Sequence, residues 1–128
     1  MGNHGINLKS FRIINIGMNV DENPNDGHLV LSEGNEVTIC PPRDQSKTKC
    51  LLEIQTKIKA SDEKEFCIQL KSHAYFLFEQ PETDFNEFVK TECYPIAAKR
   101  IHESIKMITA AAGLNPLDLE EAKEQQEN

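Results

Sequence analysis

The chain lacks the residues and sequence runs on which many functions depend. It has no tryptophan, only 6% aromatic residues, and no apolar run near the roughly 20 residues of a membrane-spanning helix. It contains no glycine-rich phosphate loop, no nucleophile elbow and no His-Glu-x-x-His motif. These absences favour a protein that is not an enzyme, and we expect no catalytic residues, no cofactor and no membrane insertion.

Positive charge is also scarce, since 14 Lys and Arg residues stand against 21 Asp and Glu residues and the net charge is −7. Nucleic-acid binding requires clustered Lys and Arg to neutralise phosphates, and an anionic membrane surface requires the same. We therefore expect neither partner. The acidity could attract a basic or unfolded polypeptide, or it could only keep the protein soluble.

The four cysteines do not have the spacing of a metal site or of a redox pair. Cys40, Cys50, Cys67 and Cys93 form no Cys-x-x-Cys motif, and the first residues lack the apolar core of a signal peptide. We expect a cytoplasmic protein with reduced cysteines and no metal.

Alternating apolar and polar residues predict three strands, over residues 11–20, 48–59 and 65–78. In the second of these, Leu52 and Ile58 point to one face while Glu53 and Lys59 point to the other. One solvent-exposed face and one buried face are typical of an antiparallel sheet. A fourth strand is expected somewhere in residues 28–40, although residues 32–35 resemble a turn between two short extended pieces.

A long helix is predicted from residue 94 onwards. Pro95 suits a first helical turn, Gly113 suits the residue just past the end, and Pro116 prevents continuation. A shorter helical pattern precedes it, with Asp84 as the expected N-cap. The apolar stripe of the long helix is predicted to consist of Ala98, Ile101, Ile105, Ile108 and Ala112.

Ile101, Ile105 and Ile108 are therefore expected in the core or at an oligomer interface. Two weaker hypotheses concern catalysis. His73 could act as a base near Cys67, and Cys93 could be a nucleophile at a helix N-terminus. The alternatives are a surface histidine and a buried thiol, and both are favoured. His102 is expected on the polar side of the helix.

Aromatic residues gather around the junction between the last strand and the helices. This cluster could be core, or it could line an apolar groove that is open to a polypeptide. We assign client binding to it as a hypothesis; its members are Phe76, Phe78, Phe85, Phe88 and Tyr94.

The helix block resembles that of the SecB-like family of export chaperones. Tyr94, Pro95, Ala97 and Arg100 are similar to the Phe-Pro-Tyr-Ala-Arg type block that opens the family's long helix. The segment that follows the helix is similar to the family's Pro-Leu-x-Leu type ending, through Gly113, Pro116, Leu117 and Leu119. The resemblance is best over residues 48–119.

The resemblance implies an α+β fold, in which an antiparallel four-stranded sheet packs against one long C-terminal helix. It implies one SecB-like domain over residues 1–122, followed by a polar tail over residues 123–128 that we expect to be disordered. Family members form homodimers and homotetramers, use no ATP, and hold unfolded clients in apolar grooves. A further implied partner is the export motor SecA, which well-known members dock through an acidic sheet surface.

The resemblance therefore implies an ATP-independent holdase chaperone that binds unfolded or pre-export polypeptides and functions in protein transport. A divergent member could serve one dedicated client, such as a toxin or antitoxin. The alternative is an oligomeric adaptor that binds one folded partner protein. A small enzyme that uses Cys93 or His73 is a much weaker third hypothesis.

Overall fold

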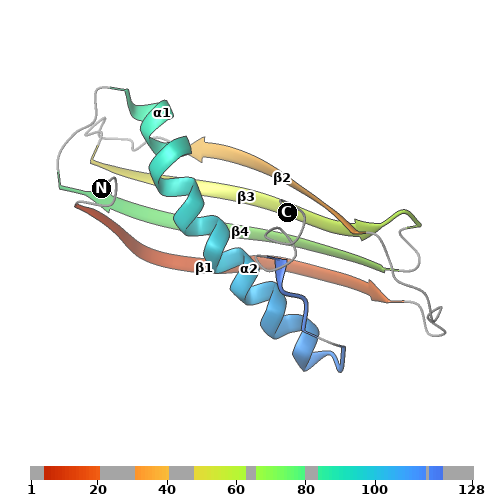
Figure 1. The fold of residues 1–128 in the computed structure, drawn as a ribbon. Coiled ribbons are helices and arrows are strands. Elements are labelled where there is room, and N and C mark those ends of the chain that lie inside the picture. The colour runs from red at the N-terminus through yellow and green to blue at the C-terminus, as the bar shows by residue number, and fades with distance from the viewer. Residues whose placement is uncertain are drawn as a thin grey trace, which may run out of the picture.

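The structure is a computed structural model, and it describes residues 5–20, 31–40, 48–62, 66–79, 84–114 and 116–119. Four strands, β1 (Ile6–Val20), β2 (Leu31–Cys40), β3 (Lys49–Ala60) and β4 (Phe66–Phe78), form one antiparallel sheet in the order β1-β4-β3-β2. A helical layer covers one face of this sheet (Figure 1). The predicted α+β fold with a four-stranded antiparallel sheet and one long C-terminal helix is confirmed.

β3 and β4 agree closely with the prediction, but β2 does not. The expected turn over residues 32–35 is wrong, because β2 pairs with β3 without interruption from Leu31 to Cys40. Ser32, Gly34 and Asn35 are turn-forming residues by local preference. Here cross-strand pairing with the strongly patterned β3 overrides that preference.

β1 is longer than predicted, and two register irregularities keep its apolar residues on one face. The register with β4 shifts between Leu8 and Ser10 and again between Ile13 and Asn15. An extra residue in one strand moves the side chains that follow it to the opposite face of the sheet. Apolar residues therefore share the face that the helices cover along the whole strand, namely Ile6, Leu8, Phe11, Ile13, Ile16, Met18 and Val20.

The helical layer begins after Asp84, as the shorter helical pattern predicts, and it runs without a break into the long helix. α1 (Phe85–Phe88) continues through η1 (Val89–Cys93), a π-helical turn, into α2 (Tyr94–Ala111). Within η1, the Tyr94 N–H donates to the carbonyl of Val89, five residues back. Pro95 lacks an N–H and its ring crowds the preceding turn, so a widened turn lets the helix continue through it. Asp84 occupies the N-cap position, but its side chain makes no capping hydrogen bond.

The buried stripe of α2 is offset from the predicted one. Ala97, Ile101 and Ile105 are buried, whereas Ala98 and Ile108 are only half-buried and Ala112 is exposed. In Figure 1, α2 crosses the sheet diagonally, beginning over β2 and β3 and ending beyond β1. This crossing leaves the last turn without sheet beneath it, which explains the exposure of Ala112.

The end of α2 is formed as the sequence predicts. Gly113 adopts a left-handed φ of 86°, and its N–H donates to the Ala110 carbonyl. The Leu114 N–H donates to the carbonyl of Thr109, which completes a Schellman cap. Glycine is favoured here because other residues rarely adopt a positive φ.

The segment after the cap returns over the sheet. The Leu117 N–H donates to the hydroxyl of Thr109, and Lys106 Nζ lies 3.3 Å from Asp118 Oδ2. These contacts place Leu119 in the core. The predicted domain end at residue 122 and the predicted disordered tail over residues 123–128 lie outside the described residues.

The core lies between α2 and the inner face of the sheet, which we define as the face toward the helices. It is mainly aliphatic, with Leu52, Ile54 and Ile58 from β3 and Ile68 and Phe76 from β4 among its fully buried side chains. Arg100 also lies 5.3 Å from the ring centroid of Phe11, which ties α2 to β1 through a cation–π contact. Among the described residues, no helix is both long and apolar enough to cross a membrane.

Candidate functional site

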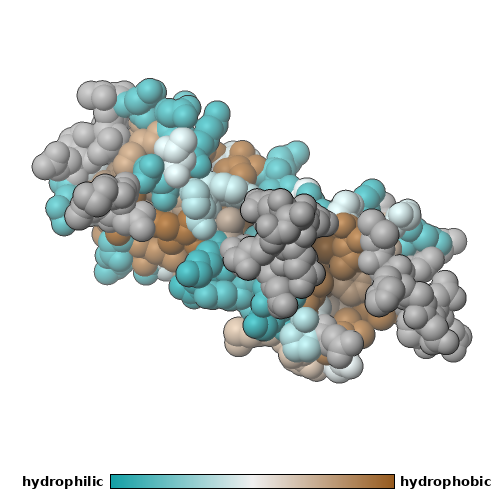
Figure 2. Space-filling model, viewed as in Figure 1, coloured by the Kyte–Doolittle hydropathy of each residue, from teal (hydrophilic) through white to brown (hydrophobic). Residues whose placement is uncertain are grey.

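Apolar side chains remain exposed at both edges of the inner face, beside the helix. Ile13, Ile16 and Val20 of β1 are 39%, 46% and 37% exposed, and Val37 of β2 is 37% exposed. We call the first three the β1 row. Figure 2 shows brown apolar surface on both sides of the mostly polar stripe of α2. The β1 row is continuous with the core, because Phe11 and Met18, which lie on the same face of β1, pack against the core.

The predicted aromatic residues are only partly brought together. Phe78 contacts Phe85 and Phe88 edge to face, with ring centroids 6.2 Å and 5.0 Å apart. Phe85 and Phe88 are half-buried, whereas Phe78 is largely buried and Phe76 is completely buried. Phe76 therefore lies in the core of this fold, and the accessible rings are those of the short helix α1.

Tyr94 lies further along the helix and is half-buried. Burial raises the pKa of its hydroxyl, and the negative charge of Glu33 raises it further. Its polar end is thus close to an acidic group on β2. Within the part of the chain that the structure describes, the ring of Tyr94 makes no aromatic contact of the kind that joins Phe78 to Phe85 and Phe88.

A chain of polar side chains crosses the inner face from β3 to α2. The Thr56 hydroxyl donates to Asn35 at 2.7 Å, and the Asn35 amide donates to Glu33 at 2.8 Å. His102 Nε2 lies 2.9 Å from the same oxygen of Glu33. His102 is 5% exposed, so the expectation that it serves solvation on the polar side of the helix is wrong.

This chain, in which Thr56 and His102 are the buried members, was missed because its partners are far apart in the sequence. Glu33 and His102 are separated by 69 positions, and the helix period alone cannot show which side of α2 meets β2. The sequence pattern that could have revealed the chain is that the polar residues Glu33 and Asn35 lie on the same face of β2 as the apolar residues Leu31 and Val37. Buried polar groups require partners, which makes the chain an anchor between α2 and the sheet edge.

The opposite face of the sheet, which we call the outer face, has polar side chains from all four strands. Glu53 Oε1 lies 3.1 Å from His73 Nε2 and 3.6 Å from Lys71 Nζ. The hydrogen bond from His73 lowers the pKa of the Glu53 carboxyl, and the nearby charge of Lys71 lowers it less. These three side chains link β3 to β4 and are accessible to solvent.

The lowered pKa of Glu53 predicts a pH effect. A depressed carboxyl pKa stabilises the folded state above the ordinary value of about 4.5, and that contribution is lost as the pH falls through the lowered value. His73→Leu should raise the pKa of Glu53 toward its ordinary value, and Lys71→Met should raise it by less. Carboxyl NMR titration measures both, and an unchanged Glu53 titration in His73→Leu would contradict the assignment.

The fold does not bring together the residues of the two catalytic hypotheses. His73 and Cys67 share the outer face of β4 but lie six residues apart, about 20 Å along a strand. Cys93 is completely buried, and its thiol hydrogen-bonds with Cys50, whose pKa this contact lowers. All four cysteines are free thiols.

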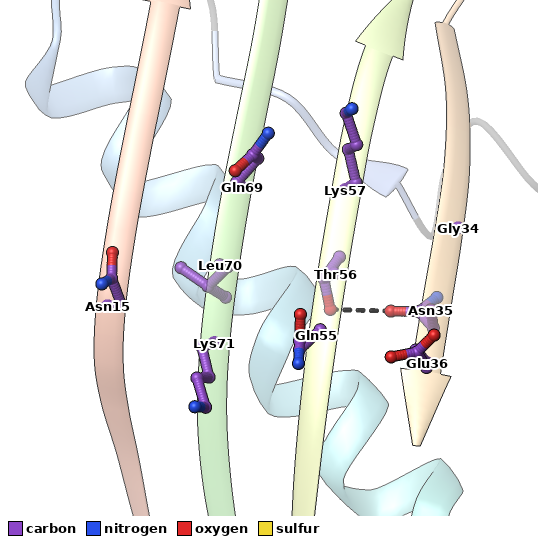
Figure 3. A pocket seen from close by; sticks show the side chains of 10 residues that line it. All are labelled: Asn15, Gly34, Asn35, Glu36, Gln55, Thr56, Lys57, Gln69, Leu70 and Lys71. Carbon is purple, nitrogen blue, oxygen red and sulfur yellow. Dashed lines mark hydrogen bonds between the residues drawn. The ribbon is translucent and has the colours of Figure 1, made fainter. Parts of the chain in front are cut away.

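A shallow hollow lies in the middle of the outer face. It has a volume of about 590 Å³, and Figure 3 shows it with α2 behind the strands. Side chains from β1, β2, β3 and β4 surround it: Asn15, Glu36, Gln55, Lys57, Gln69 and Lys71. Gly34 also borders the hollow, where a side chain would meet no atom within 4 Å. Over the described ranges, no cluster of three or more potential metal ligands occurs.

The fold matches a solved structure of known class. It is similar to a SecB-like chaperone of Mycobacterium tuberculosis, solved in complex with a ChAD peptide from the HigA1 antitoxin. The TM-score is 0.68 at 13% sequence identity, and the match covers 88% of this chain and 84% of that chain. No protein-family model and no curated protein matches the sequence. The protein therefore has a SecB-like fold, and its structural neighbour is a chaperone rather than an enzyme.

Proposed function

We propose that this protein is an ATP-independent holdase chaperone that binds extended, unfolded polypeptide on the inner side of its sheet. The observation that carries the proposal is the β1 row, a line of exposed apolar side chains beside the helix. Exposed apolar surface that continues from a core is typical of a site for another chain. Alternate side chains of an extended client would fit beside such a row.

The aromatic residues of α1 extend this surface at the other end of the inner face. We propose that Phe85 and Phe88, supported from below by Phe78, and the ring of Tyr94 contact the client. Aromatic side chains provide large contact areas for varied partners. Phe76 is assigned a supporting role only, since it has no exposed surface.

The structural neighbour supports peptide binding by this fold. That chaperone is bound to a peptide from an antitoxin. By analogy, one dedicated client, such as an antitoxin or a pre-export protein, is the finer form of the proposal. We further propose a cytoplasmic homodimer or homotetramer, since apolar residues on an edge strand suit pairing with a second copy.

Docking to the export motor SecA has less support. The resemblance implies an acidic sheet surface for that contact. The outer face here includes Arg12, Lys49, Lys57, Lys59 and Lys71 against Glu36 and Glu53. A role in protein transport therefore rests on the family resemblance alone.

The test of a holdase is suppression of aggregation for several unrelated denatured proteins, without ATP. An adaptor for one folded partner should suppress none of them. Ile13→Ser together with Ile16→Ser should weaken suppression if the β1 row holds the client. Light scattering with and without an unfolded client then measures the mass of the oligomer. A smaller mass in the double variant would assign the β1 row to an interface between copies.

Phe88→Ser tests the aromatic part of the site. We expect weaker binding of unfolded chains with an unchanged oligomer, because the half-buried ring loses apolar contact area with the client. Circular dichroism is the control for folding. A native spectrum with full client binding would contradict the assignment, and a lost fold would assign Phe88 to the core.

A further inference from the structure

The outer face of the sheet is a second surface whose charge differs from that of the whole chain. Among the residues paired in the strand register, five cationic side chains face outward, from Arg12, Lys49, Lys57, Lys59 and Lys71. Two carboxylates, Glu36 and Glu53, face the same way. These paired residues thus sum to a charge of +3, five cations less two carboxylates, in a protein with a net charge of −7.

The face is also concave where its polar side chains meet. Lys57 and Lys71 border the hollow together with the amides of Gln55 and Gln69 (Figure 3). Gly34 leaves space beside Lys57, its partner in the strand register. No steric requirement explains glycine at this position, since an added Cβ would meet nothing within 4 Å.

We propose that this hollow is a docking site for a short acidic segment of a partner protein, separate from the apolar site on the inner side. The lysine ammonium groups attract carboxylates, and the glutamine amides can donate to and accept from an extended backbone. The proposal goes beyond the holdase function and does not depend on it.

A polypeptide is favoured over a nucleic acid by the extent of the basic region. Charges beyond about 8 Å are largely screened at physiological ionic strength, so a short acidic segment responds mainly to this face. A longer polyanion would extend past it and meet the acidic remainder of the protein.

The experiment uses fluorescence anisotropy with a labelled ten-residue peptide rich in Asp and Glu. A peptide of the same length with Asn and Gln in place of the acids is the ligand control. We expect binding of the acidic peptide, weakened by salt, and little binding of the neutral one. Lys57→Gln with Lys71→Gln should weaken binding roughly tenfold. Lys90→Gln with Lys99→Gln, the same charge change on exposed helical positions, should leave it nearly unchanged.

Gly34→Phe is a second variant that keeps every charge and fills the hollow. It should also abolish most acidic-peptide binding, while aggregation suppression by the inner side stays intact in both variants. Equal weakening by the two lysine pairs would overturn the proposal, as would unchanged binding in Gly34→Phe. Tighter binding of a single-stranded oligonucleotide that competes with the peptide would overturn it in favour of nucleic acid. Because aggregation suppression is measured separately, failure of the docking site and failure of the holdase function are distinguishable.

Discussion

Ile105→Asp should abolish stable folding of the protein. Ile105 is 0% exposed in the core between α2 and the sheet, and a carboxylate there would lose its hydration without gaining a partner. We expect a loss of more than about 4 kcal/mol in the free energy of unfolding, which lies in the range of exceptional single substitutions. That loss is comparable to the whole stability of many domains of this size.

Two variants of the same helix calibrate this result. Ile101→Ala removes buried methyl groups without adding charge, and it should cost about 2–5 kcal/mol. Met107→Asp places the same carboxylate at a side chain that is 72% exposed, and it should change stability by less than about 0.5 kcal/mol. Denaturant unfolding followed by circular dichroism measures all three. An Ile105→Asp protein with the stability of Met107→Asp would show that this helix face is not buried.

Glu33→Ala should produce the second largest effect. Glu33 accepts from the exposed Asn35 at 2.8 Å and lies 2.9 Å from His102, so its removal leaves the buried His102 without this acceptor. A buried donor left without its acceptor is costly, and we expect a loss of about 2 kcal/mol. Glu36→Ala, on the exposed face of the same strand, is the matched control and should cost far less.

A double-mutant cycle separates the pair from the rest of the chain. His102→Leu alone should also destabilise the fold, since Glu33 would remain beneath the helix without this partner. The combination Glu33→Ala with His102→Leu should cost less than the sum of the losses in Glu33→Ala and His102→Leu. Additive losses would show that the 2.9 Å contact contributes no coupling between β2 and α2.

The strands and the long helix could be predicted because their patterns are local. In β3 a buried side chain alternates with a more exposed one along its whole length, and this alternation was visible in Leu52, Ile54 and Ile58. Gly113 and Pro116 marked the helix end because glycine readily adopts the left-handed conformation of such a cap and proline cannot continue a helix. The turn predicted within β2 failed because local turn preference is weaker than pairing along ten residues.

The candidate sites were less predictable than the fold. The aromatic residues were recognised from their density, but density did not separate Phe76, which has no exposed surface, from the half-buried Phe85 and Phe88. The β1 row could be seen as an apolar pattern, yet its exposure depends on where α2 crosses the sheet. The outer hollow was not foreseen, because it combines residues from four strands.

The sequence by itself determined the class of fold, the end of the long helix and the one-sided burial of β3, since each depends on neighbouring residues. Only the tertiary structure decided the register of β1, the widened turn before Pro95 and the pairing of Glu33 with His102. It also decided which apolar side chains stay uncovered. These features depend on contacts between distant segments, and a single helix laid diagonally over a broad sheet cannot cover both of its edges.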